Sequence, residues 1–159
     1  MKAVIASTPI ALAVRADAPA IAALSRVAIE HGLPWRWTPA RVLRSIDHRE
    51  TNVAVARDGA ALLGFGIMRY AGDTAHLLLL AVAPAHRRGG IGSALLHWLE
   101  DVAHTAGIER IALEARTDNE AGRCFYNEHG YHEGAIVPAM YSRRVHGVRL
   151  EKWLRPQAT

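Results

Sequence analysis

Apolar residues recur with the period of an α-helix in four segments of the chain. In the first, Ile21, Leu24 and Val27 share one face of a helix that Gly32 is placed to end. The other three helical segments span residues 38–46, 91–106 and 119–129. The longest of them carries a continuous apolar stripe, which is typical of an amphipathic helix packed on a sheet.

Between these helices the pattern changes to that of β-strands. Residues 53–56 and 62–70 flank turn residues Asp58-Gly59 and predict a hairpin. Residues 76–82 form an unbroken apolar run, which favours a strand covered on both faces in the middle of a sheet. Further strands are predicted at 10–15, 108–116, 131–137 and 145–154, the last two joined by a loop around residues 138–144.

The order of these elements predicts an α/β (α+β) fold with a mixed sheet, not a doubly wound one. We expect a central twisted sheet of about seven strands, with about four helices distributed over both faces. A chain of 159 residues fits one domain. We place that domain at residues 10–154, with short terminal extensions at 1–9 and 155–159.

Composition narrows the choice of partners. Half of the residues are apolar and 21% are charged, as in ordinary globular proteins. The net charge of +4 is spread along the chain, which favours a small anionic ligand over nucleic acid. The one cysteine, Cys124, excludes an internal disulfide, and we expect it to be a small core residue. Without a signal peptide or a membrane-length apolar run, we predict a cytoplasmic protein; a homodimer stays open.

Residues 87–93, Arg-Arg-Gly-Gly-Ile-Gly-Ser, join the buried strand to the amphipathic helix. A helix N-terminus presents amides without intrahelical partners and attracts anions. Its glycines let the backbone approach a ligand closely, and Arg87 and Arg88 add positive charge. Two linked phosphates suit this turn. The turn lacks the lysine of a Walker loop, which excludes that motif. Two other interpretations stay open. The turn could bind a dinucleotide, although Leu95 replaces the third glycine of that motif, or it could be a plain helix start.

The turn resembles the acetyl-CoA-binding motif of the Gcn5-related N-acetyltransferases, as Arg87-x-x-Gly90-x-Gly92 after the strand end at 80–84. Residues 113–119 followed by 125–131 are similar to that family's second cofactor motif. The resemblance implies acetyl-CoA as co-substrate and no metal. It assigns cofactor contacts to Leu80, Ala81, Val82, Arg87, Arg88, Gly89, Gly90, Ile91, Gly92, Ser93, Asn119 and Tyr126.

The same resemblance implies the catalytic groups. Backbone amides of residues 80–82 would stabilise the oxyanion of acetyl transfer, and Tyr126 would protonate the thiolate. A phenol with a pKa of about 10 can protonate a thiolate of about 8.5 only with help from its surroundings. Tyr126 could instead only pack on the cofactor, and Asn119 could simply cap a helix.

Glu114 lies in an otherwise apolar strand, at the position of a proposed general base in ribosomal-protein and N-terminal-amine acetyltransferases of this family. It could act through water, or it could form a structural ion pair with Arg116 or Arg69. His76 is a second candidate base.

The resemblance leaves the acceptor open. It implies direct acetyl transfer to a primary amine, either of a small molecule or of a peptide or protein N-terminus. Trp35, Trp37, Tyr70 and Tyr141 are candidates for its pocket, with core packing as the default. Glu114 favours a peptide as the acceptor, whereas the long stretch 131–148 disfavours one. Polyamines and aminoglycosides are disfavoured because they would need an acidic pocket, and the N-terminal half has few acidic residues. The alternative function is a non-catalytic acyl-CoA-binding sensor.

Overall fold

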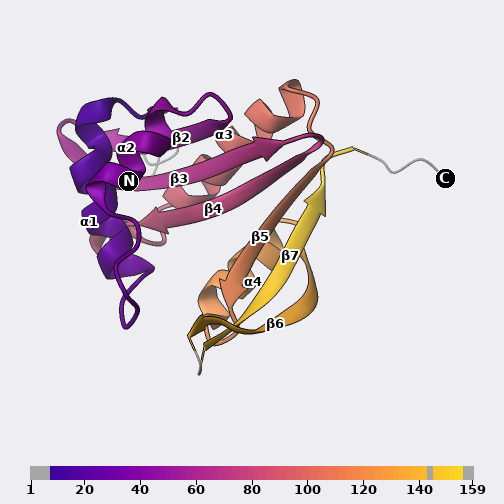
Figure 1. The fold of residues 1–159 in the computed structure, drawn as a ribbon. Helices are drawn as coiled ribbons and strands as arrows, with labels where there is room; N and C mark the ends of the chain where they lie inside the picture. Colours follow the sequence, from indigo (N-terminus) through magenta and orange to yellow (C-terminus); the bar gives the residue numbers. More distant parts are fainter. Residues whose placement is uncertain (1–7, 143–144, 156–159) are drawn as a thin grey trace.

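The computed structural model describes residues 8–142 and 145–155. Its seven strands form one mixed sheet in the order β1-β2-β3-β4-β5-β7-β6 (Figure 1). The elements are β1 (Ile10–Leu12), α1 (Ala18–Ala28), α2 (Pro39–Asp47), β2 (Thr51–Asp58), β3 (Ala61–Ala71), β4 (Thr74–Val82), α3 (Ile91–Thr105), β5 (Arg110–Arg116), α4 (Glu120–Glu128), β6 (His132–Ser142) and β7 (Val145–Trp153). The sheet and its four helices confirm the predicted fold class.

Two hydrophobic cores lie on opposite faces of the sheet. One lies beneath α1 and α2 and includes Val55 and Phe65. The other lies beneath α3 and includes Met68, Leu95 and Leu99. Both cores draw residues from β3 and β4, so the central strands are buried on both faces, as their apolar sequences predict.

Glycines in β3 set the distance between α3 and the sheet. A Cβ atom at Gly66 would lie 2.7 Å from Leu99 Cδ1, and one at Gly64 would lie 2.8 Å from the carbonyl oxygen of Ala81. Larger residues at these two positions would therefore push α3 or β4 away. The start of α3, which carries the glycine turn, is thus held close to the end of β4.

A β-bulge in β4 sits where the sheet divides. Ile67 pairs with Leu79 and Met68 with Leu77, so Leu78 is an extra residue on β4. The parallel pairing of β4 with β5 runs only from Thr74 to Leu77. Beyond it the two strands diverge (Figure 1), and we call this point, after Leu77 and Leu113, the strand junction.

The C-terminal hairpin differs from the predicted strand–loop–strand arrangement. β6 continues to Ser142, through most of the expected loop at 138–144, of which residues 143–144 lie outside the described part. β6 is an edge strand, where Pro138 costs no ladder bond that a central strand would need. Its register shifts between Val137 and Ser142, and Ala139 has a positive φ of 53°, so the strand is irregular.

Cys124 lies elsewhere than expected, because it is exposed on α4 and is not a core residue. One carboxylate of α3 is buried: Glu100 accepts from Tyr131 Oη at 2.7 Å and pairs with Lys152. Across the described residues no helix is long and apolar enough to span a membrane, and no group of three potential metal ligands occurs.

Candidate active site

The glycine turn at residues 87–93 is shaped by left-handed backbone. Gly90, the N-cap of α3, has φ 84°, and Arg88 has φ 67°. No side chain caps the helix, and its first hydrogen bond runs from Ala94 N to Gly90 O. The amides before Ala94 therefore have no intrahelical partner and can receive an anion.

Two of the predicted cofactor contacts are held by bonds within the protein. Ser93 Oγ lies 2.9 Å from Nε2 of His129, whose Nδ1 lies 2.7 Å from the Phe125 carbonyl. Since a carbonyl only accepts, Nδ1 carries the proton in the neutral ring, and Ser93 donates to Nε2. Asn119 Oδ1 accepts from Gly122 N at 3.0 Å, so Asn119 is an N-cap of α4.

The end of β4 exposes backbone groups in an alternating way. Ala83 N donates to Leu63 O on β3 at 2.8 Å, and the Ala81 carbonyl also faces β3, beside Gly64. Successive residues of a strand direct these groups to opposite sides. The amides of Leu80 and Val82 therefore face the side from which β5 has diverged, and that of Ala81 does not.

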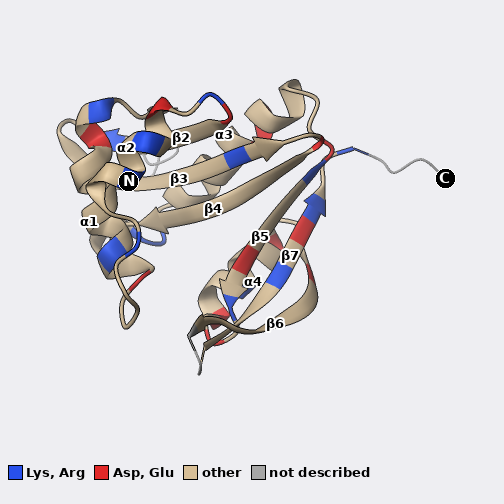
Figure 2. Ribbon diagram, viewed as in Figure 1, with Lys and Arg blue, Asp and Glu red and all other residues tan. Residues whose placement is uncertain are grey.

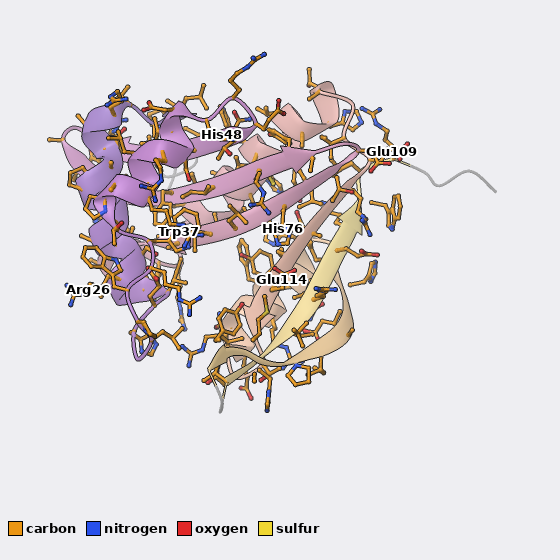
Figure 3. All side chains as sticks on the ribbon, in the orientation of Figure 1. Arg26, Trp37, His48, His76, Glu109 and Glu114 are labelled. Carbon is orange, nitrogen blue, oxygen red and sulfur yellow. The ribbon has the colours of Figure 1, made fainter. Side chains whose placement is uncertain are left out.

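Glu114 and His76, the two candidate bases, form a pair at the strand junction (Figure 3). Their Oε1 and Nε2 atoms lie 2.7 Å apart, with side-chain exposures of 14% and 29%. Neither expected partner binds Glu114: Arg116 pairs with Asp118, and the second cation near Glu114 is Arg149, with Nε 3.7 Å from Oε2.

Sheet register explains why these two residues meet. His76 pairs across the strands with Ala112, and Glu114 follows two residues later on the same face. Glu114 is also the first residue of that face beyond the last β4–β5 pair, Leu77 with Leu113. Its carboxylate thus stands where the strands separate. Its β7 partner in the register is Arg149, a site residue that the sequence analysis missed.

Two tyrosines extend this arrangement toward α4. Burial raises the pKa of Tyr126 well above its usual value, and the charge that Tyr141 would carry raises it further. Burial, then the Glu114 carboxylate, raises the pKa of Tyr141 to about 12. Tyr141 therefore lies within electrostatic reach of both Glu114 and Tyr126, and both phenols stay protonated at neutral pH. Tyr126 itself packs against the core beneath α3.

The structure separates the remaining predicted pocket residues. Trp37 is buried in the core beneath α1 and α2, under the guanidinium of Arg41. Trp35 is partly buried against the same core, and its Nε1 has no hydrogen-bond partner among the described residues. Tyr70 packs on the opposite core, where its hydroxyl accepts from Asn52 at 2.8 Å, so it lies on the other face from Glu114.

Comparison with known proteins identifies the class to which this fold and site belong. The sequence signature of the acetyltransferase (GNAT) family matches residues 20–131. The chain belongs to this family and is an N-acetyltransferase.

One sequence relative supports this assignment, and two solved structures share the fold. The chain is 30% identical over 106 residues to the [ribosomal protein bS18]-alanine N-acetyltransferase of Escherichia coli K12, covering 67% of this chain and 70% of that protein. The crystal structure of the E. coli ribosomal-protein-S18-alanine N-acetyltransferase superposes with a TM-score of 0.81 at 24% identity, over 94% and 96% of the two chains. The PaiA N-acetyltransferase of Thermoplasma acidophilum, solved with coenzyme A, gives 0.78 at 18% identity, over 91% and 98%.

Proposed function

We propose that this N-acetyltransferase moves the acetyl group of acetyl-CoA to the α-amine at the N-terminus of a peptide or protein. The observation that carries the proposal is the His76–Glu114 pair at the strand junction, beside the diverging end of β4. Solved relatives contain coenzyme A, and a sequence relative acts on the alanine of a ribosomal protein.

The residues of the glycine turn fit the pyrophosphate of acetyl-CoA. The turn offers the unpaired amides at the start of α3 and two cations, Arg87 and Arg88, that form no ion pair with a described carboxylate. When bound, acetyl-CoA supplies the thioester. The amides of Leu80 and Val82 would then donate to the developing oxyanion.

Glu114 serves as the general base in this proposal, and His76 positions it. A carboxylate only accepts hydrogen bonds, so His76 donates its Nε2 hydrogen to Oε1 and fixes the orientation of the carboxylate. Oε2 lies 3.7 Å from Arg149 Nε, beyond hydrogen-bond distance, and takes the amine proton, directly or through water.

Tyr126 donates a hydrogen bond to the departing thiolate. Because its pKa is raised, full proton transfer to a thiolate of pKa about 8.5 is uphill. The phenol therefore stabilises the developing charge more than it releases a proton, and its contribution to the rate is modest.

A matched pair of peptides tests the acceptor. One has a free α-amine and no lysine; the other has the same sequence with a blocked α-amine and one internal lysine. We expect thiol release from acetyl-CoA, and a product acetylated at its N-terminus by mass spectrometry, with the first peptide only. Equal use of the second peptide, or turnover of small amines alone, would contradict the proposal.

A further inference from the structure

Among the described residues, two groups of arginines have no carboxylate partner. One is the glycine turn, with Arg87 and Arg88. The other lies on the α1–α2 side of the sheet, and we call it the arginine cluster: Arg36, Arg41, Arg44 and Arg69. Arginine is charged at every physiological pH, so a group of unpaired guanidiniums attracts anions.

Three members of the arginine cluster lie near enough to the fourth, Arg41, to affect its pKa. Burial lowers the pKa of Arg41, Glu30 opposes that shift, and the charges of Arg44, Arg36 and Arg69 lower it further. The Arg41 guanidinium stacks 3.9 Å from the centre of the Trp37 ring. An anion placed among these side chains would relieve their mutual repulsion.

The carboxylate of Glu30 is already used inside the loop between α1 and α2. It is buried, and its oxygens accept from Ser25 Oγ at 2.9 Å, from Arg36 N at 2.7 Å and from Trp37 N at 3.2 Å. These bonds hold the loop in shape. Because the Glu30 carboxylate is occupied by them, the exposed side chains of Arg36 and Arg69 have no carboxylate partner of their own among the described residues.

The arginine cluster reaches the strand junction through Arg69. Arg69 lies directly opposite His76 in the antiparallel β3–β4 register, and His76 contacts Glu114. Directly opposite residues have Cα atoms about 4.5–5.5 Å apart. An extended peptide advances about 3.3 Å per residue, so a peptide with its amine at Glu114 can bring its next side chains to Arg69. Figure 2 shows basic residues on α2 and β3 on this side.

We propose that the arginine cluster selects acceptors with acidic residues directly after the reacting N-terminal residue. This inference rests on the proposed function, since it assumes a peptide amine at Glu114. Arg69 receives the carboxylate nearest the amine, and Arg36 receives the following one.

Three peptides that differ only at positions two and three test the selection: Asp-Glu, Asn-Gln and Lys-Lys after a common N-terminal alanine. We expect kcat/KM to favour the acidic peptide over the neutral one by about fivefold per acidic residue, because such contacts are exposed and partly screened. The preference should weaken as salt is raised.

The variant Arg36→Gln/Arg69→Gln should lose this preference, mainly through KM, and still acetylate the neutral peptide. Its matched control is Arg123→Gln/Arg155→Gln, which removes the same charge at α4 and after β7; it should keep the preference. Thermal unfolding of both variants verifies folding. Equal or better use of the neutral or lysine peptide by the wild type would overturn the selection, and so would a preference that survives in Arg36→Gln/Arg69→Gln. Failure with all three peptides, alongside turnover of small amines, would instead refute the proposed function.

Discussion

The glycine turn and the strand junction are assembled in opposite ways. The turn is seven consecutive residues, 87–93, and it works through backbone amides that follow from local dihedral angles. The junction pairs His76 of β4 with Glu114 of β5, and Tyr141 of β6 lies within electrostatic reach of Glu114 and of Tyr126 on α4. One site is exposed and built from main chain; the other is partly buried and built from side chains. The difference teaches that the proposed cofactor site is a local property of this chain, whereas the proposed catalytic site depends on the whole sheet.

Alkaline pH should destabilise the packing around the buried tyrosines more than it affects the exposed glycine turn. The pKa values of Tyr126 and its ring neighbour Tyr131 are raised in the folded protein. The unfolded chain therefore loses these protons first, and stability present below pH 10 falls as pH rises. Two such groups lower the free energy of unfolding by up to about 3 kcal/mol per pH unit.

Urea unfolding at pH 9, 10 and 11 measures this fall, and tyrosinate absorbance reports ionisation. Absorbance that rises to a full titration near pH 10 while the protein stays folded would contradict the burial of these phenols.

Removing the proposed base should affect the chemistry and spare the turn. We expect Glu114→Gln to lower kcat/KM about a hundredfold, in the range of general-base catalysis, with unchanged coenzyme A affinity. Glu151→Gln is the matched control, because Glu151 lies on the neighbouring strand β7 and binds Arg110. Steady-state kinetics and calorimetry measure the two effects. If the Glu114→Gln enzyme has the wild-type rate, Glu114 is not the general base.

Tyr126→Phe should have a smaller effect, about tenfold on kcat, because a phenol of raised pKa is a weak acid. Tyr70→Phe removes a hydroxyl that accepts from Asn52, away from Glu114, and serves as control, with kcat within about twofold of wild type. Single-turnover thiol release compares them. A loss of a thousandfold or more in Tyr126→Phe would show that full proton transfer to the thiolate is required.

Gly90 and Gly107 allow the role of the glycine turn to be separated from the stability of α3. They flank α3 with φ of 84° and 88°, and an added Cβ would meet no atom within 4 Å at either. Replacing either by alanine should therefore cost a similar 1–2 kcal/mol of stability, about the strain of a left-handed residue. Only Gly90→Ala should also weaken coenzyme A binding, by a few-fold in calorimetry. Equal weakening in Gly107→Ala would mean that helix stability, and not the turn, sets the affinity.

The sequence predicted the local features and not the assembled ones. The position of the glycine turn and the burial of β4 on both faces could be predicted because each depends on consecutive residues. The pairing of His76 with Glu114 depends on the β4–β5 register, which no single strand encodes. Strand alternation puts Glu114 on the same face as Ala112, but only the registers with β4 and β7 place His76 and Arg149 on that face.

Side-chain surroundings explain the other differences. Cys124 occupies the exposed side of a short helix, a position that residue type alone does not reveal. Tyr70 and Tyr141 looked equivalent as aromatic residues of strands. The structure places them differently, since Tyr70 lies over the α3 core and Tyr141 lies within electrostatic reach of Glu114.

The extra residue Leu78 gives β4 two halves that are out of phase. Before it, Leu77 joins the core beneath α3; after it, Leu79 joins the core beneath α1 and α2. Deleting Leu78 would join Leu77, opposite Met68, directly to Leu79, opposite Ile67, so both halves would keep their cores and their partners on β3. The bend that a bulge gives its strand would be lost, and this bend lies at the strand junction. A one-residue deletion would thus yield a well-folded protein whose amides at Leu80 and Val82 have moved relative to Glu114, and foldedness in this chain is no guarantee of activity.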